Sequence, residues 1–451
     1  MEEMNMNDID IYGLTGEIVR PHASDYESAR QHWNRAVNQY PDLIVFCLNQ
    51  TDVRNALRWA KNNHFAFRIR NGRHHYAGYS TGDQVLVIDV SRMNAIAMHD
   101  GLLQIECGVS NRQVYDFLSV FGIPFPGGDC PTVGVCGFAL GGGWGLSCRK
   151  MGLGCDSMAE LELIDCDGHL LVVNAENHAD LFWACRGAGG GNFGVVVSMT
   201  FALPEKSDQI CSVEFKCADA DIEKQAQFLL LWQSWLSDAD ERITMIAKIY
   251  RSSKEDYAIS GKAFFYGTVQ EAEMVLRPFR EINGLTLHIA QMTFHEAITI
   301  IQDNHADFET FQSTGRFVRK SLNDSEARQS VALLQDIPQG SVYSALTLYA
   351  LGGKAGETQS DETAFFNRDA DYIISIQSQW TDGQDAQSNK EWVGKQFRYL
   401  KSITQGSYIN FPYCDLENPM QEYYGENADR LRTIKKKYDP NGFFSFPQCI
   451  R

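Results

Sequence analysis

Residues 125–156 read FPGGDCPTVGVCGFALGGGWGLSCRKMGLGCD, a stretch rich in glycine that also carries apolar residues such as Val133, Phe138 and Trp144. Glycine at this density disfavours the interiors of helices and strands, and the apolar residues argue against a flexible linker. A backbone without bulky side chains can lie against a flat or anionic ligand and donate N–H groups to it. We therefore expect a ligand cradle here, with Cys130 as its reactive side chain.

The length and composition indicate a globular protein of two domains. The chain has 451 residues, which is more than one ordinary hydrophobic core accommodates. Of these residues 44% are hydrophobic and 22% are charged, close to the average for folded proteins. The formal net charge of −17 opposes binding to nucleic acid or to anionic membranes. No apolar stretch approaches the roughly 20 residues of a membrane span, and the acidic first residues are unlike a signal peptide.

The twelve cysteines are scattered along the chain and none forms a Cys-x-x-Cys pair. That spacing is what zinc ribbons and thioredoxins require. We interpret the cysteines as free, buried thiols, and we expect a reducing, cytoplasmic location.

Hydrophobic periodicity predicts two architectures in succession. Before a boundary near residue 205 we expect helices over 26–40, 51–62 and 180–185, and strands over 43–48, 66–70, 85–90, 158–166 and 169–174. After it we expect strands near 210–217, 243–251, 259–266, 342–351 and 372–380, and helices near 221–237, 268–282 and 324–335. This second pattern predicts an antiparallel sheet backed by helices. A helix near 429–436 precedes an aromatic tail that we expect to pack on the N-terminal part.

A dinucleotide-binding fingerprint is formally present at Gly189, Gly191 and Gly194. The fingerprint requires a strand before it and a helix after it, whereas here a helix precedes and a strand follows. We therefore expect no Rossmann-type NAD site.

Two glycine-bearing loops each hold one nucleophile, namely His74 in residues 70–80 (RNGRHHYAGYS) and Cys130. His74 and His75 point to opposite sides of an extended segment and no third ligand has a useful spacing, so we expect no metal site. The motifs of serine hydrolases, zinc proteases and phosphate-binding loops are absent. Two nucleophiles aimed at one molecule fit an electrophilic, planar cofactor.

Three segments carry a resemblance to a known family: residues 70–80, residues 127–153 (GGDCPTVGV, then GGGWG and RKMGL) and residues 438–448 (YDPNGFFSFPQ). They resemble the motifs of the berberine bridge enzyme-like, FAD-linked oxidases of the vanillyl-alcohol oxidase superfamily. The resemblance implies an α+β fold with a PCMH-type two-part FAD-binding domain (1–205 and 401–451) and a substrate-binding domain (206–400). It also implies a bicovalent FAD, bonded to His74 at the 8α-methyl group and to Cys130 at C6.

The resemblance further implies which residues hold the cofactor. The loop that includes Ser80 would hold the pyrophosphate, the stretch 137–145 would lie against the flavin, and residues 189–195 would cover the adenosine side. The expected cofactor-binding residues are His74, Cys130, Arg70, Asn71, Gly72, Arg73, His75, Gly78, Tyr79, Ser80, Gly128, Thr132, Val133, Gly134, Gly137, Gly141, Gly142, Trp144, Gly194, Val195, Val196, Tyr408 and Asn410.

For the chemistry, the resemblance favours Tyr408 as the base, with Asn410 as a supporting polar group. A free tyrosine has a pKa near 10, so Tyr408 needs help from a neighbour or must act in concert with hydride transfer. On the predicted strand 372–380, Ser375 and Gln377 share one face. Some relatives place a carboxylate or glutamine near Ser375, and serine cannot serve as that base.

The sequence therefore predicts an FAD-dependent oxidase that converts an alcohol or hemiacetal carbon of a sugar, oligosaccharide or natural product to the carbonyl level. Val133 is small and lies where the family gates oxygen, which favours O2 as the acceptor and hydrogen peroxide as a product. Oxidative cyclisation or desaturation and a non-enzymatic flavin-binding structural role stay open as alternatives, as does the oligomeric state. The sequence departs from the family pattern at Arg73, His75, Ala77 and Phe411.

Overall fold

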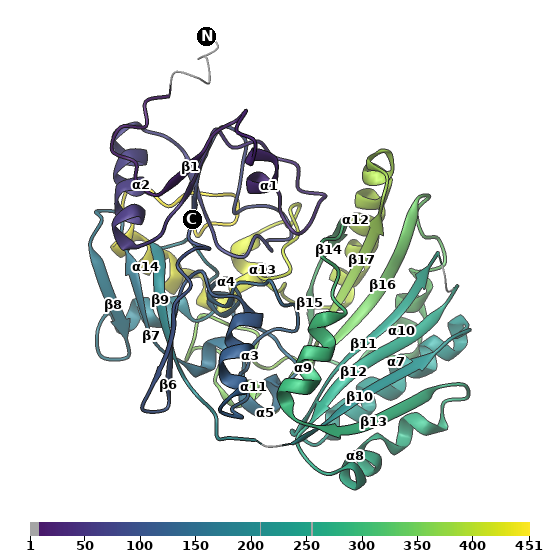
Figure 1. Ribbon diagram of the computed structural model, residues 1–451. Coiled ribbons are helices and arrows are strands. Elements are labelled where there is room, and N and C mark those ends of the chain that lie inside the picture. The colour runs from purple at the N-terminus through teal and green to yellow at the C-terminus, as the bar shows by residue number, and fades with distance from the viewer. Residues whose placement is uncertain (1–8, 208, 254–255) are drawn as a thin grey trace.

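The computed structural model describes residues 9–207, 209–253 and 256–451, and it contains three sheets (Figure 1). The first sheet has the order β1-β2-β4-β3, formed by Glu17–Val19, Leu43–Phe46, Leu86–Asp89 and Phe67–Arg70. β2, β4 and β3 are parallel, and β1 is antiparallel to β2. Helix α2 (Gln50–Asn62) connects β2 to β3, and the side chain of Asn49 caps it by accepting from the N–H groups of Thr51 and Asp52.

The second sheet is antiparallel, with the order β5-β6-β9-β7-β8. Its strands are Ile96–His99, Leu102–Glu106, Val195–Ala202, Met158–Ile164 and Leu170–Asn174. The predicted hairpin is β7–β8. Between β6 and β7 the chain forms α3 (Asn111–Ser119), and the glycine-rich stretch itself holds the short helices α4 (Val135–Leu140), α5 (Cys148–Met151) and η2 (Gly154–Ser157). Helix α6 (Ala179–Cys185) leads into β9.

The third sheet has eight antiparallel strands in the order β13-β10-β12-β11-β16-β17-β14, with β15 also paired to β17. The strands are Thr286–Met292, Ile210–Cys217, Ala258–Phe265, Ile243–Ser252, Ser341–Ala350, Tyr372–Trp380, Phe311–Ser313 and, for β15, Arg316–Val318. Helices α7 (Ile222–Asp238), α10 (Asp324–Ala332) and α12 (Ala386–Ile403) pack on one face, and α8 (Val269–Leu276) with η3 (Arg277–Glu281) lies at the β13 edge. Helix α9 (Phe294–Asp303) instead contacts α3.

Side chains of β17 alternate between two hydrophobic cores, as expected for a strand that separates two layers. Ile374 and Ile376 join the core beneath α7 and α12, whereas Ile373 joins the core shared with the first two sheets. The C-terminal segment contributes to the core shared with the first two sheets. It contains α13 (Pro419–Tyr424), η5 (Gly425–Asn427) and α14 (Ala428–Tyr438). Purple and yellow ribbons therefore lie together in Figure 1, opposite the large sheet.

Tertiary contacts overrule several local predictions. The helix expected over 26–40 ends as α1 (Tyr26–Arg30), because the following segment extends and Asn34 donates to the carbonyls of Tyr76 and Phe311. The helix expected over 268–282 divides into α8 and η3 where Pro278 stands. Strands β1, β5, β6 and β13, and helices α3, α9 and α12, were not predicted.

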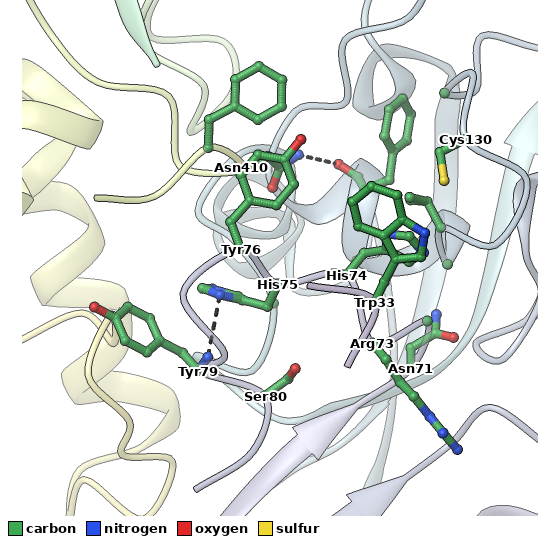
Figure 2. Close-up of a pocket in the computed structure, with 18 of the residues that line it drawn as sticks. Trp33, Asn71, Arg73, His74, His75, Tyr76, Tyr79, Ser80, Cys130 and Asn410 are labelled. Carbon is green, nitrogen blue, oxygen red and sulfur yellow. Dashed lines mark hydrogen bonds between the residues drawn. The ribbon is translucent and has the colours of Figure 1, made fainter. Parts of the chain in front are cut away.

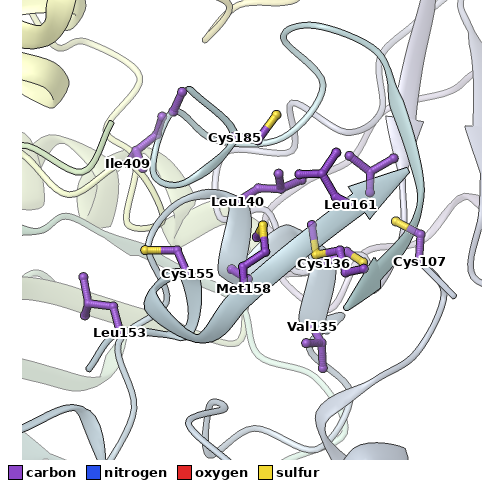
Figure 3. Packing of buried hydrophobic residues seen from close by; sticks show 14 of the residues in the cluster. Cys107, Val135, Cys136, Leu140, Leu153, Cys155, Met158, Leu161, Cys185 and Ile409 are labelled. Atoms are coloured by element: carbon purple, nitrogen blue, oxygen red, sulfur yellow. The ribbon is translucent and has the colours of Figure 1, made fainter. Parts of the chain in front are cut away.

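The twelve cysteines are unpaired and nine are buried, which confirms the expectation of free thiols. Figure 3 shows Cys107, Cys136, Cys155 and Cys185 around α4 and β7, among Val135, Leu140, Leu161 and other apolar side chains. No helix within the described residues has the length and apolar character to cross a membrane.

Candidate functional site

A cavity of about 830 Å³ lies between the first two sheets and the large sheet. This volume is at the upper end of the range for small-molecule and cofactor sites. Its floor comes from the loop after β3, the glycine-rich stretch and residues 189–191, and its roof from β11, β16 and β17. The C-terminal tail closes one end with Phe446 and Gln448.

The two nucleophile-bearing loops meet because Gly72 has no side chain. A Cβ at Gly72 would lie 2.4 Å from the backbone nitrogen of Gly134 and 2.9 Å from the carbonyl oxygen of Thr132. The neighbouring Asn71 amide donates to the carbonyl of Cys107, which fixes the loop against the end of β6. The loops are thus in backbone contact, and only glycine permits this approach.

His74 and Cys130 flank one hydroxyl group. The Nε2 atom of His74 lies 2.7 Å from Oγ1 of Thr132, and Sγ of Cys130 lies 3.8 Å from the same oxygen. The Trp33 indole stacks on the His74 ring with centroids 5.1 Å apart (Figure 2). Both side chains line the cavity, so the two reactive atoms face one end of a ligand bound there.

The two nucleophiles differ in protonation. Burial lowers the pKa of His74 to about 3, assisted by the charge of His305, so the imidazole is neutral at physiological pH. Burial raises the pKa of Cys130 to about 11, although the N–H groups of Thr132 and Val133 and the Thr132 hydroxyl pull it down. Stabilisation of the thiolate by backbone amides is therefore present but is outweighed by desolvation.

The remaining surface of the cavity fits a long, partly anionic cofactor. A Cβ at Gly137 would meet no protein atom within 4 Å, so the space above α4 is open for a flat group. The buried Asn71 Oδ1 and Arg68 Nε have no protein partner. Arg68 donates to the carbonyls of Phe67 and Ser445, and no carboxylate among the described residues pairs with it. A diphosphate or a ring amide would supply the missing partners.

Most expected cofactor contacts line the cavity. They are His74, Cys130, Asn71, Gly72, Arg73, His75, Tyr79, Ser80, Gly128, Val133, Gly134, Gly137, Trp144, Gly194, Val196 and Asn410, and the expected substrate-side residue Gln377 joins them. Figure 2 shows how the loop 71–80 carries several of these side chains along one wall. Arg73 adopts a left-handed φ of 62° and its Nη1 donates to the carbonyl of Ser28.

Several expected contacts lie elsewhere. Arg70 is buried, with Nε 2.6 Å from Oδ2 of Asp89 and Nη2 donating to the carbonyl of Ala29, so it supports the loop from behind. Thr132 holds the two nucleophiles rather than lining the cavity. At three glycines an added Cβ would contact protein atoms and not the cavity: Gly78 lies against Val37, Gly141 against Asn410 and Gly142 against Phe365. Val195 and Ser375 are fully buried.

Tyr408, the expected base, is buried and is not among the residues that line the cavity. The residue is 2% exposed. Its hydroxyl accepts from the N–H groups of Gly143 and Trp144 at 3.0 and 3.1 Å and from the Asn410 amide at 3.1 Å. Burial raises its pKa to about 12. The hydroxyl therefore supports the glycine turn from behind, and Phe411 lines the cavity in its place.

Ser375 is also buried away from the cavity. It shares a face with Gln377, as predicted, but its hydroxyl hydrogen-bonds with that of Ser313, and neither hydroxyl is exposed to the cavity. Gln377 and Gln379 are the polar groups that β17 presents to the cavity.

The cavity is also lined by ionisable side chains that the sequence reasoning missed. Asp129, Lys248, His305 and Glu309 line the cavity, and we call them the acid–base cluster. His305 Nε2 lies 3.9 Å from Oδ2 of Asp129. Glu309 Oε2 accepts from the Gln379 amide at 3.0 Å. The sequence offered one signal for these residues, since Asp129 directly precedes the predicted nucleophile Cys130. Among the described residues, no group of histidine, cysteine and carboxylate side chains has the geometry of a metal site.

Two family descriptions match the chain. Residues 41–174 match "FAD binding domain" and residues 407–451 match "Berberine and berberine like". An uncharacterized FAD-linked oxidoreductase of Bacillus subtilis, YgaK, is 36% identical over 446 residues, which cover 97% of each chain.

Solved structures share the fold over nearly the whole chain. The berberine bridge enzyme-like protein 1 of Physcomitrella patens has a TM-score of 0.89 at 24% identity, covering 96% of each chain. A chitooligosaccharide oxidase has a TM-score of 0.88 at 21% identity, covering 97% of each chain. These likenesses confirm the expected mixed helix-and-sheet architecture, and the match of residues 41–174 shows that it includes an FAD-binding part.

Proposed function

The chain belongs to the berberine-like family of FAD-linked oxidoreductases, and on that premise we propose that it is an oxidase with FAD bonded to both His74 and Cys130. The observation that carries this proposal is the shared contact of His74 Nε2 and Cys130 Sγ with the Thr132 hydroxyl. Both nucleophiles thus face the same end of the cavity, as two bonds to one ring of a flavin require.

The rest of the cavity divides between cofactor and substrate. Asn71, Arg68 and the open surface over Gly137 would hold the cofactor, and the roof residues of β11, β16 and β17 would face a substrate. Bound FAD would supply a two-electron acceptor for hydride. Attachment at two points keeps a cofactor in place in a cavity wide enough to admit a sugar or a glycosylated natural product.

We propose an alcohol or hemiacetal as the substrate, with O2 as the final acceptor and hydrogen peroxide as a product. The aromatic rings of Tyr76, Tyr349 and Phe411 favour a sugar: Tyr76 and Phe411 stack at 5.4 Å, and Tyr349 lies 5.1 Å from Phe411. Apolar ring faces beside polar groups are a common surface for carbohydrates, and the chitooligosaccharide oxidase shares this fold.

The attachment is tested on purified protein denatured in acid. Flavin should stay with the wild-type polypeptide, His74→Ala and Cys130→Ala should each retain it through one bond, and the double variant should release it. Release from the wild type would refute both bonds.

The reaction is tested anaerobically with a panel of D-glucose, cellobiose, N,N′-diacetylchitobiose and benzyl alcohol, read by bleaching of the flavin. Air should then restore the yellow colour and yield one peroxide per carbonyl product. A product with a new ring or alkene would replace the alcohol oxidase proposal by oxidative cyclisation or desaturation.

A further inference from the structure

Glu309 is held at the end of the cavity where the two nucleophiles lie. Its backbone N–H donates to the Trp33 carbonyl at 3.1 Å, and its own carbonyl accepts from the N–H of Arg35 at 2.7 Å. Trp33 in turn stacks on His74. This pairing joins segments more than 270 residues apart and fixes the Glu309 side chain on the cavity wall.

The Glu309 carboxylate is oriented but not neutralised. One oxygen accepts from the Gln379 amide at 3.0 Å, and no ion pair with Glu309 occurs within the described ranges. Burial raises the pKa of Glu309 above that of an ordinary glutamate, against the pull of Lys248, His305 and Gln379. Asp129 differs, because His305 and Lys248 hold its pKa below the usual value. Glu309 is therefore the stronger base of the two carboxylates.

Lys248 faces the same space from β11. It lies directly across the sheet from Thr347, which also lines the cavity. Asp129 and Glu309 both act on its charge, yet it forms no ion pair with either carboxylate in the part of the chain that the structure describes. A gap bounded by an ammonium group and carboxylates suits a substrate hydroxyl, which accepts from one and donates to the other.

We propose that Glu309 is the catalytic base of this enzyme, that Lys248 binds the reacting hydroxyl oxygen, and that Gln379 positions the carboxylate. This inference rests on the proposed oxidation of an alcohol or hemiacetal. The alcohol loses two electrons: its O–H proton passes to the Glu309 carboxylate, its C–H bond breaks with the electron pair leaving to bound FAD as hydride, and a C=O bond forms.

The central test compares Glu309→Gln with Asp307→Asn, an exposed carboxylate two residues earlier in the same segment. General base catalysis is worth about 10²–10⁴-fold, so E309Q should slow anaerobic reduction by the best sugar of the panel by at least about 100-fold. D307N should stay within about twofold of the wild type. Melting temperature and covalent flavin content should match in all three proteins.

The pH profile provides a second readout. Wild-type reduction should fall as pH drops through the Glu309 pKa, Glu309→Asp should keep an acid limb, and E309Q should lose it. The ionisable or polar groups around Glu309 are Lys248 on β11, Tyr343 and Tyr349 on β16, Gln379 on β17, and Tyr76 and His305 on loops. The pH profiles of Lys248→Met and Gln379→Leu therefore serve as comparisons. Q379L should move the acid limb to higher pH, because the Gln379 hydrogen bond lowers the pKa of Glu309.

Binding without turnover separates base from binding group. Chemically reduced holoenzyme is titrated calorimetrically with the sugar and with its 1-deoxy analogue (for D-glucose, 1,5-anhydro-D-glucitol). A hydrogen bond to a charged group is worth about 1.5–3 kcal/mol, or roughly 10–100-fold in affinity. The wild type and E309Q should prefer the sugar, and K248M should lose that preference.

Three outcomes decide the inference. Slow reduction with intact binding in E309Q supports Glu309 as the base. If E309Q is reduced as fast as D307N, Glu309 is not the base, although the proposed oxidase activity stands. If no member of the panel reduces wild-type flavin, the proposed function fails and the assignment of Glu309 falls with it.

Discussion

Removing one nucleophile at a time should give two proteins whose flavin attachment responds differently to pH. In His74→Ala the remaining bond forms through Cys130, and only its thiolate is nucleophilic. With a pKa of about 11, the thiolate fraction is about 10⁻⁴ at pH 7 and about 10⁻² at pH 9. Attachment to this variant should therefore accelerate about 100-fold between those two values.

In Cys130→Ala the bond forms through the neutral imidazole of His74. Its pKa of about 3 leaves the ring unprotonated across pH 6–9, so the attachment rate should change less than about twofold over that range. The contrast is a direct consequence of burial, which favours the neutral form of both groups and so activates the histidine while suppressing the thiolate.

The assay uses flavin-free protein from riboflavin-starved cells, mixed with saturating FAD in air at each pH. Samples are quenched in acid, and protein-bound flavin fluorescence is read in a denaturing gel, with the double variant as the blank. A flat profile for H74A would refute the proposed protonation state of Cys130. A tenfold slope per pH unit for C130A would refute that of His74.

Four further substitutions test the packing around the site. Gly137→Ala should stabilise flavin-free protein by about 0.5–1 kcal/mol in chemical denaturation, because alanine favours the helix and its Cβ meets open space. The same substitution should lower FAD incorporation. Gly145→Ala should instead impair folding, because its Cβ would lie 2.1 Å from a backbone oxygen. Tyr408→Phe should cost about 1–3 kcal/mol of stability by leaving backbone N–H groups unpaired, with flavin reduction near the wild-type rate; a large loss of rate would restore Tyr408 to the chemistry. Asp89→Asn should cost about 3–5 kcal/mol, because it leaves the Arg70 charge buried without its partner, and an unchanged melting temperature would contradict that.

Local chemistry made much of this protein predictable. The β-strands near His74 and those of the large sheet follow from short apolar or alternating runs. The two nucleophiles stand out because each occupies a glycine-bearing loop. Only glycine at position 72 permits contact between those loops. The proximity of His74 to Cys130 therefore depends on a residue type that is visible in the sequence. The family resemblance then named the cofactor.

The direction in which each side chain points was not predictable in the same way. Tyr408 and Phe411 are three residues apart, yet the first is locked behind the glycine turn by three donors and the second faces the cavity. Their local sequence does not distinguish them, because two of the three donors come from residues 143–144, far away in the chain. The helix expected over 26–40 failed for a similar reason, since Asn34 finds its partners near residues 76 and 311.

By itself the sequence determined the reactive groups, the glycine positions and the alternating strands, because these depend on the chemistry of single residues and on short-range periodicity. Only the tertiary structure decided that Glu309, Lys248 and Asp129 share one cavity with His74, because pairing of distant segments brings them there. It also decided that the pKa of Cys130 rises, because desolvation depends on everything packed around a group and not on its neighbours in the chain.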